Sequence, residues 1–306
     1  MSAITVEHIS RKYGDITALD DISFKVQDGE LFGLIGPDGA GKSTLFRILT
    51  TLLIADEGKG TVAGHNVVLE YKEVRKKVGY MPGRFSLYQD LSVEENLSFF
   101  ATIFGTTIEK NYDLIKDIYV QIEPFKNRLA GKLSGGMKQK LALCCALIHK
   151  PKVLFLDEPT TGVDAVSRKE FWDMLQSLKE KNITILVSTP YMDEASLCDR
   201  IALIQKGKIL KIDNPQQMTD DFKKPLYAIK TNDTYNTLKY LRKQDFTQSI
   251  LPFGEFLHLT TAEKIAPEVL GTVLKKEGFK VAQVKAIKAT VEDVFLDLST
   301  TKKDRV

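Results

Sequence analysis

Residues 36–44 read GPDGAGKST, a glycine-rich stretch that ends in a lysine and two hydroxyl residues. The spacing G-x-x-x-x-G-K-[ST] is typical of a loop in which backbone N–H groups approach phosphate at the start of a helix. Lys42 would place a positive charge at the β- and γ-phosphates, and the Ser43 hydroxyl is a Mg²⁺ ligand. The residues predicted to bind a nucleoside triphosphate are Gly36, Pro37, Asp38, Gly39, Ala40, Gly41, Lys42, Ser43 and Thr44.

Two adjacent carboxylates, Asp157 and Glu158, follow the apolar run VLFL at residues 153–156. Alternation along a strand predicts that they point to opposite sides, so that they can serve different roles. Asp157 is suited to Mg²⁺ binding through water, and Glu158 is suited to polarising an attacking water as the catalytic base. An acidic pair at a strand end is ordinary by itself, but after a phosphate loop it indicates nucleotide hydrolysis.

These groups need strands and helices to position them, and the surrounding pattern supplies both. Residues 31–35 and 183–189 are short apolar runs that predict buried parallel strands, and residues 42–53 have a helical pattern. In open α/β sheets, ligands bind in loops at the carboxyl ends of such strands. The sequence therefore predicts an α/β fold with the nucleotide site at this edge.

The flanking segments have different patterns. Residues 2–10 and 19–27 alternate with a period of two, which predicts antiparallel strands, and residues 200–212 predict a hairpin that turns at 206–208. Ser92 and Glu95 have the spacing of a capping box at a helix start. Helical patterns then continue to about residue 149, and an acidic, helix-like stretch follows Pro190.

We expect a domain boundary near residue 215, with one domain at 1–215 and a second at 216–306. The second follows the order strand-helix-strand-strand-helix-strand, which predicts a small ferredoxin-like α+β domain. An amphipathic helix at 291–299 closes it, and we expect residues 301–306 to be frayed.

Composition excludes several classes of partner. The chain has 43 basic and 40 acidic residues, which gives a net charge of +3. A dedicated nucleic-acid-binding protein usually shows a basic stripe, and this charge balance does not suggest one, so we expect no nucleic-acid partner. The three cysteines form no CxxC or Cys/His cluster, which argues against structural metal sites and disulfides. No apolar stretch reaches about 18 residues, so work at a membrane would be that of a peripheral protein.

Residues 133–140 read LSGGMKQK, which alone could be a simple helix N-cap followed by glycines. The motifs GPDGAGKST, LSGGMKQK and LFLDEPTTGVD in this order resemble the ATPase subunit of ABC transporters over residues 1–214. The resemblance implies a P-loop NTPase fold of ABC ATPase type. That fold has a RecA-like core, an antiparallel β subdomain and a helical subdomain, here at about 84–140.

The resemblance also implies how ATP and Mg²⁺ are bound. Tyr13 matches the aromatic residue that stacks on adenine, although a tyrosine that only packs on its strand is the alternative. Ser134, Gly135 and Gly136 match the signature that contacts the γ-phosphate of ATP on a partner subunit, and Asp164 matches the loop that communicates across that interface.

Partners and location follow from the same resemblance. It implies a homodimer or heterodimer of ATPase subunits, peripheral on the cytoplasmic face of the cell membrane, with an integral membrane permease subunit as partner. A groove near residues 84–97 would receive a short helix of the permease. The tail VEDVFLDLS at 291–299 resembles that of drug- and polysaccharide-exporter ATPases, which implies export.

Two positions depart from the family pattern. Gly83 stands where most members have a glutamine that contacts Mg²⁺ and the lytic water, and Gln89 is too far along the chain to replace it. Pro190 stands where most have a histidine that bonds the γ-phosphate, and proline has no side-chain donor.

Three interpretations stay open. In the first, the chain is an ATPase that couples dimer closure and hydrolysis to transport, with a reduced rate. In the second, it binds ATP as a regulatory subunit that is impaired in hydrolysis. In the third, it is a nucleotide-sensing ABC-type protein that is not part of a transporter.

Overall fold

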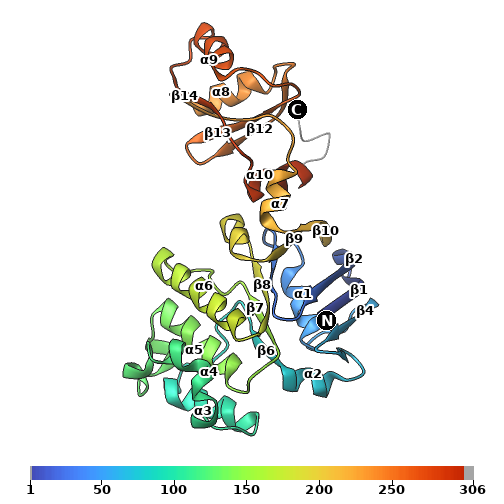
Figure 1. Ribbon diagram of the computed structural model, residues 1–306, viewed down its shortest axis with the longest axis vertical. Coiled ribbons are helices and arrows are strands. Elements are labelled where there is room, and N and C mark those ends of the chain that lie inside the picture. The colour runs from blue at the N-terminus through green and yellow to red at the C-terminus, as the bar shows by residue number, and fades with distance from the viewer. Residues whose placement is uncertain (1, 300–306) are drawn as a thin grey trace. The chain divides into compact units, whose positions relative to one another are not determined.

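The structure is a computed structural model, and it describes residues 2–299 (Figure 1). The chain divides into two compact units, one that ends at Asn214 and one that begins at Pro215. The stretch 301–306, expected to be frayed, lies outside the described residues.

The first unit contains an antiparallel sheet in the order β2-β1-β4-β5. Its alternating apolar residues point into the core of the unit, with Ile4 paired to Val26. The two expected antiparallel strands are therefore confirmed. The strands are β1 (Ser2–Tyr13), β2 (Ile16–Gln27), β4 (Glu57–Val62) and β5 (His65–Asn66).

The second sheet of this unit has the order β10-β9-β3-β8-β7-β6, and all neighbours except β9 and β10 run parallel. Strands β3, β7 and β8 are buried along their whole length, which explains their continuous apolar runs. The hairpin turn is confirmed, because Gln205 pairs with Lys208 across it. The strands are β3 (Leu31–Ile35), β6 (Val78–Met81), β7 (Val153–Asp157), β8 (Thr184–Thr189), β9 (Arg200–Gln205) and β10 (Lys208–Asp213).

Helices α3, α4 and α5 lie together in the first unit (Figure 1). The capping box at Ser92 and Glu95 is confirmed at the start of α3, where each residue binds the other's backbone N–H. Helix α5 continues to Leu147, beyond the residue 140 expected to close the helical subdomain. The helices are α1 (Lys42–Leu49), α2 (Tyr71–Lys77), α3 (Val93–Ile103), α4 (Tyr112–Tyr119), α5 (Gly135–Leu147) and α6 (Ala165–Glu180).

The acidic stretch after Pro190 forms the 3₁₀ helix η4 (Met192–Leu197) rather than an α-helix. Three further 3₁₀ turns connect the α-helices of this unit: η1 (Glu109–Asn111), η2 (Glu123–Phe125) and η3 (Ala130–Lys132).

The second unit has an antiparallel sheet in the order β12-β13-β11-β14, which is the ferredoxin-like strand order. Apolar residues of β11 and β13 form a core with residues of α8 and α9. His258 and Asp293 pair at 2.6 Å and tie α10 to the sheet. Its elements are α7 (Pro215–Asp220), β11 (Leu226–Thr231), α8 (Thr234–Leu241), β12 (Thr247–Phe253), β13 (Phe256–Thr261), α9 (Pro267–Lys276), β14 (Val281–Ala286) and α10 (Val291–Ser299).

A helix that spans a membrane must be both long and apolar. Within residues 2–299, none of the helices combines the length and apolar character that crossing a bilayer requires.

Candidate functional site

The glycine-rich loop runs from the end of β3 to the start of α1, as its motif predicts. A Cβ on Gly36 would lie 2.1 Å from the backbone oxygen of Ile204, and one on Gly41 would lie 2.4 Å from that of Ala18. Gly39 and Gly41 also have positive φ values, 75° and 106°. Glycine is therefore required for both close packing and backbone conformation, while residues 37–39 stay exposed.

Lys42 is the first residue of α1, and its side chain is only 3% exposed. Its ammonium group donates to the carbonyl oxygens of Gly36 and Pro37, at 2.7 and 3.0 Å. It also lies 3.0 Å from Oε1 of Glu158. The lysine is thus held inside the curve of the loop, with its charge directed to one point next to the carboxylate.

Asp157 ends strand β7 and is buried, and its Oδ1 accepts a 2.6 Å hydrogen bond from the Ser188 hydroxyl. Glu158 lies beyond the strand end and has a positive φ of 51°. Alternation along the strand therefore does not explain how the two carboxylates separate, because β7 ends at Asp157. They diverge because the backbone of Glu158 turns into the left-handed region, which directs its carboxylate to Lys42.

The structure places Gly83 beside the acidic pair. A Cβ at this position would lie 3.0 Å from the backbone oxygen of Asp157 and 3.8 Å from Cβ of Glu158. Pro190 follows Thr189, whose carbonyl accepts a hydrogen bond from the N–H of Gly36. Both departures from the family pattern therefore adjoin the residues that would meet the γ-phosphate.

The signature residues form a second group with the loop that precedes α6. Ser134 caps α5 by accepting a hydrogen bond from the N–H of Met137, and a Cβ on Gly136 would lie 2.8 Å from Oγ of Ser167. Asp164 caps α6, and hydrogen bonds from Ser167 and Val166 lower the pKa of its carboxyl. Ser134, Gly135 and Asp164 are exposed, so a second molecule can reach them.

Tyr13 ends strand β1 and is 43% exposed, with the Arg11 guanidinium 5.2 Å from its ring centre. It pairs with Ile16 at the start of β2, two residues before the Ala18 that packs on Gly41. The ring is accessible on the strand pair that abuts the phosphate loop. Packing against its own strand does not bury it.

A set of buried polar residues that was not predicted from the sequence lies behind the acidic pair. Ser188 bonds both Asp157 and the N–H of Glu158, while Glu194 bonds Thr160 and Thr189. The sequence held one signal for them: Ser188 and Thr189 follow the apolar run 185–187 at the end of β8, and Glu194 comes five positions after Thr189.

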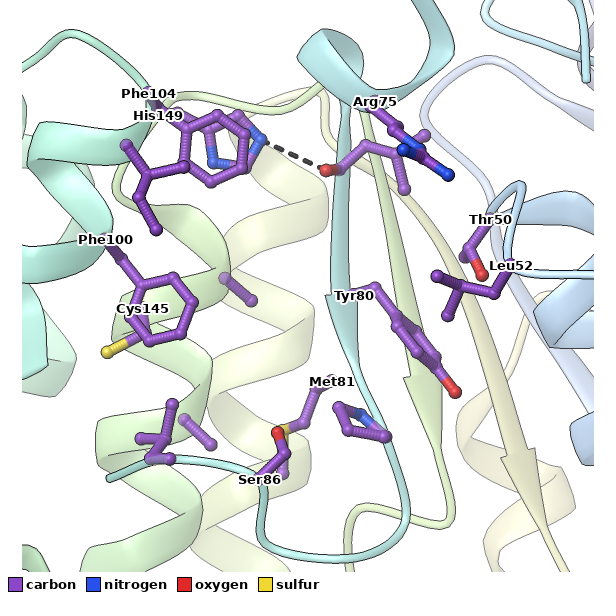
Figure 2. Close-up of a pocket in the computed structure, with 16 residues that line it drawn as sticks. Thr50, Leu52, Arg75, Tyr80, Met81, Ser86, Phe100, Phe104, Cys145 and His149 are labelled. Atoms are coloured by element: carbon purple, nitrogen blue, oxygen red, sulfur yellow. Dashed lines mark hydrogen bonds between the residues drawn. The ribbon is translucent and has the colours of Figure 1, made fainter. Parts of the chain in front are cut away.

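An apolar cavity of about 460 Å³ lies between the parallel sheet and the helical region of the first unit. Figure 2 shows Phe100, Phe104 and His149 on one side and Tyr80 on the other. The cavity shares only Ser86 and Leu87 with the stretch 84–97 where a groove was expected.

Two aromatic side chains of the cavity have shifted pKa values. Burial, with Asp157 as a further contribution, raises the pKa of Tyr80 to about 12. Burial lowers the pKa of His149, whose Nε2 donates to the carbonyl of Val78 and whose ring stacks on Phe104 at 3.7 Å. Strand β6, which carries Tyr80, pairs with β7, which ends at Asp157, so the cavity wall lies next to the acidic pair.

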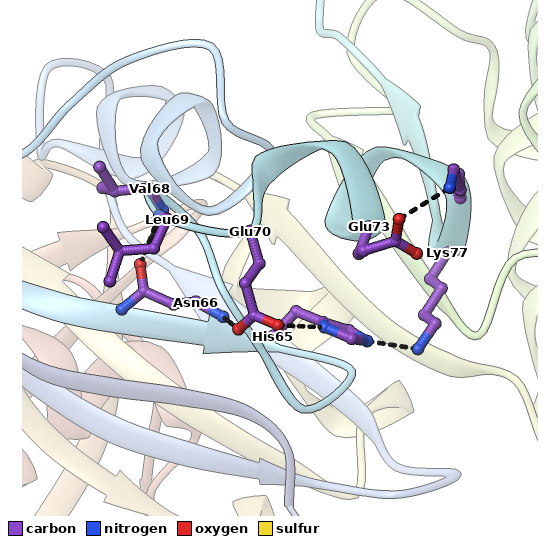
Figure 3. Close-up of polar contacts among 8 residues, drawn as sticks. His65, Asn66, Val68, Leu69, Glu70, Glu73 and Lys77 are labelled. Atoms are coloured by element: carbon purple, nitrogen blue, oxygen red, sulfur yellow. Dashed lines mark hydrogen bonds and ion pairs between the residues drawn. The ribbon is translucent and has the colours of Figure 1, made fainter.

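A polar cluster orders the connection from β5 to α2, which carries Arg75 of the cavity (Figure 3). His65 bonds Oε1 of Glu70 at 2.9 Å and contacts the ammonium of Lys77, and Glu70 also accepts from the N–H of Asn66. The hydrogen bond from Asn66 is the main cause that lowers the pKa of Glu70. These contacts indicate that the cluster stabilises the turn between β5 and α2.

Comparison with known proteins gives a family match and several relatives. A family model described as "ABC transporter" matches residues 19–161. The chain is 40% identical over 219 residues to "Probable multidrug ABC transporter ATP-binding protein YbhF" of Escherichia coli (strain K12), covering 71% of the chain and 38% of that protein. It is 33% identical over 308 residues to "Nod factor export ATP-binding protein I" of Rhizobium sp. (strain N33), covering 99% of each.

Solved structures resemble the chain in fold. The structure titled as the ATP binding subunit of an ABC transporter superposes with a TM-score of 0.66 at 25% identity, over 72% of this chain and 93% of that one. The structure of cbiO1 from Clostridium perfringens gives 0.64 at 26% identity, over 72% and 91%. The chain spans about two fifths of the length of the multidrug relative, and almost the whole length of the Nod factor relative.

Proposed function

The chain belongs to the family of ABC transporter ATP-binding proteins, and on that premise we propose that it binds and hydrolyses ATP to drive export through a separate membrane subunit. The observation that carries this proposal is the contact of Lys42 with Glu158 at 3.0 Å. It brings the phosphate loop and the proposed catalytic base to one place, next to Asp157 and Gly83.

The residues fit ATP bound with Mg²⁺. Backbone N–H groups of residues 36–44 and the Lys42 ammonium would hold the phosphates. The Ser43 hydroxyl would bind Mg²⁺ directly and the Asp157 carboxylate would hold it through water, since Mg²⁺ prefers hard oxygen ligands. The ion would neutralise charge on the phosphates. Ser188 leaves one carboxylate oxygen of Asp157 available by bonding the other. Tyr13 would stack on the adenine.

We place ATP between two subunits. The exposed Ser134 and Gly135, with Gly136, would contact the γ-phosphate on the partner, and Asp164 beside them would report across the interface. The partner is a second copy or a related ATPase subunit.

The apolar cavity would receive a short helix of an integral membrane permease at the inner face of the cell membrane. The cavity wall includes Met81 at the end of β6. Gly83 follows Met81 by two residues and lies beside the acidic pair. A helix that presses on this wall would therefore sense the catalytic carboxylates. Names of the relatives, a multidrug and a Nod factor export protein, support export as the direction.

A tagged chain, with MgATP, should capture an integral membrane protein from detergent-solubilised membranes. Ile103→Asp places a charge at an exposed apolar position of the cavity and should abolish capture, whereas Val269→Asp in the second unit should not. Failure to capture any membrane-spanning protein would count against the transporter role and leave ATP binding to be judged separately.

A subunit that binds ATP but hardly hydrolyses it is the alternative that Gly83 and Pro190 left open in the sequence. Gly83 and Pro190 both adjoin the acidic pair or the start of the phosphate loop, and neither has a side-chain donor. ATP turnover by the purified chain distinguishes the two proposals. An active ATPase should turn over faster than Glu158→Gln, and a subunit that hardly hydrolyses ATP should not.

A further inference from the structure

A buried carboxylate, Glu194, joins two segments on either side of the proposed catalytic base. It is 2% exposed, and its two oxygens accept hydrogen bonds from Thr160 Oγ1 at 2.8 Å and Thr189 Oγ1 at 2.5 Å. Both threonines are buried as well. A buried carboxylate costs free energy unless it accepts hydrogen bonds. The two threonine hydroxyls therefore strongly favour the observed position of the Glu194 carboxylate.

The two threonines are anchored to the site by their backbones. The loop after Glu158 is held by the N–H of Thr161, which donates to the carbonyl of Glu158, and by that of Val163, which donates to Thr160. Thr189 accepts from Gly36 through its carbonyl and from the N–H of Tyr191 through its hydroxyl. Thr189 thus bonds both Glu194 and Gly36, the first residue of the phosphate loop. Through Thr189, Glu194 connects Gly36 to the loop that follows Glu158.

Arg168 extends this connection to α6. Its Nε lies 3.9 Å from Glu194, another of its nitrogens lies 3.4 Å from Asp193, and its guanidinium lies 5.1 Å from the ring centre of Tyr191. Arg168 is one turn after Asp164, which caps the same helix. The same cluster thus reaches the loop proposed to face the partner subunit.

Glu158 needs such support. Its φ of 51° lies in the left-handed region, which costs free energy for a residue with a side chain and persists only where the surroundings hold it. Its N–H is held by both the carbonyl and the hydroxyl of Ser188, at 3.1 and 3.0 Å. The carbonyl side of Glu158 depends on the loop that Thr160 anchors.

We propose that Glu194 is a positioning residue for hydrolysis: by locking Thr160 to Thr189, it holds Glu158 in place at a site where Gly83 and Pro190 offer no side-chain hydrogen-bond donor. This inference rests on the proposed ATPase function. Glu194 does not touch ATP; it acts through the backbone on either side of the base.

The test uses the full chain and follows MgATP turnover. Thr160→Val removes one donor at nearly constant shape, and Glu194→Ala removes the lock. Each should lower kcat about ten- to a hundredfold, with KM for MgATP changed less than about twofold, because misplacing the base affects the chemical step. Glu194→Gln should retain most activity, since an amide can bond both hydroxyls. Asp193→Asn, an exposed carboxylate beside the same arginine, should behave as wild type.

Hydrogen exchange gives a readout that does not need turnover. The amides of Thr161 and Val163 should exchange faster in Thr160→Val, while those of α1 keep their protection, because only the loop is released. Unchanged exchange at these two amides, or normal kcat in an active Thr160→Val enzyme, overturns the lock. A wild type no faster than Glu158→Gln would instead overturn the ATPase function, and exchange would still report on the lock.

Discussion

The two ends of the proposed ATP site are built differently. At the phosphate-loop end, the side chain of Lys42 has three oxygen contacts within 3.0 Å, and tight packing requires glycine at positions 36 and 41. At the end where water would attack, positions 83 and 190 carry a glycine and a proline. There, the buried Ser188 hydroxyl binds the N–H of Glu158, and the buried Glu194 carboxylate binds the hydroxyls of Thr160 and Thr189.

This difference separates binding from hydrolysis. Phosphate affinity depends on N–H groups and a lysine that are all present, whereas the rate depends on groups aimed at charge that develops in the transition state. Loss of one such donor typically lowers a rate about a hundred- to thousandfold without abolishing it. We therefore expect changes at the two ends to affect different kinetic parameters.

The largest effect is expected for Glu158→Gln. Removing a general base typically lowers turnover about 10²- to 10⁴-fold, while the phosphate loop remains intact. The variant should bind MgATP and accumulate as a dimer, which light scattering after size-exclusion chromatography measures. Equal turnover of Glu158→Gln and wild type would mean that this end of the site is not catalytic.

Lys42→Ala should lower the affinity for ATP. A charge-assisted hydrogen bond is worth about 1.5–3 kcal/mol, so ATP affinity should fall about ten- to a hundredfold. Titration with a fluorescent ATP analogue measures this loss. Arg47→Ala, an exposed change near the other end of α1, is the matched control and should bind normally. Tight binding by Lys42→Ala would remove the basis for contrasting the two ends.

The same contrast explains how far the sequence was informative. The phosphate loop, the capping box at Ser92 and the succession of strands and helices along the second unit depend on short-range patterns, so they could be predicted. The left-handed backbone of Glu158 could not, because alternation assumes that the strand continues. The lock between Thr160 and Glu194 spans 34 positions and requires the folded sheet. The cavity likewise combines short segments that are distant in sequence.

Pro190→His would restore a donor at the water-activating end. If the missing donor limits the rate, turnover should rise about tenfold, with ATP affinity nearly unchanged, because the gain arises in the transition state. Steady-state kinetics of the purified chain measure both parameters. Pro190→Ala is the control, since it also removes the proline ring but supplies no donor. An equal gain in both variants would show that ring rigidity is the limiting feature.

The smallest effect is expected at Tyr13, which lies at neither end and would contact only the base of the nucleotide. Aromatic stacking is worth about 0.5–1.5 kcal/mol, so Tyr13→Ala should weaken ATP about two- to tenfold and leave kcat unchanged. Tyr13→Phe keeps the ring and should bind as wild type. Because the triphosphate contacts are the same for any base, affinity for inorganic triphosphate should not change in either variant. A parallel loss for inorganic triphosphate would mean that Tyr13 supports the phosphate loop through β2 and Ala18 rather than binding adenine.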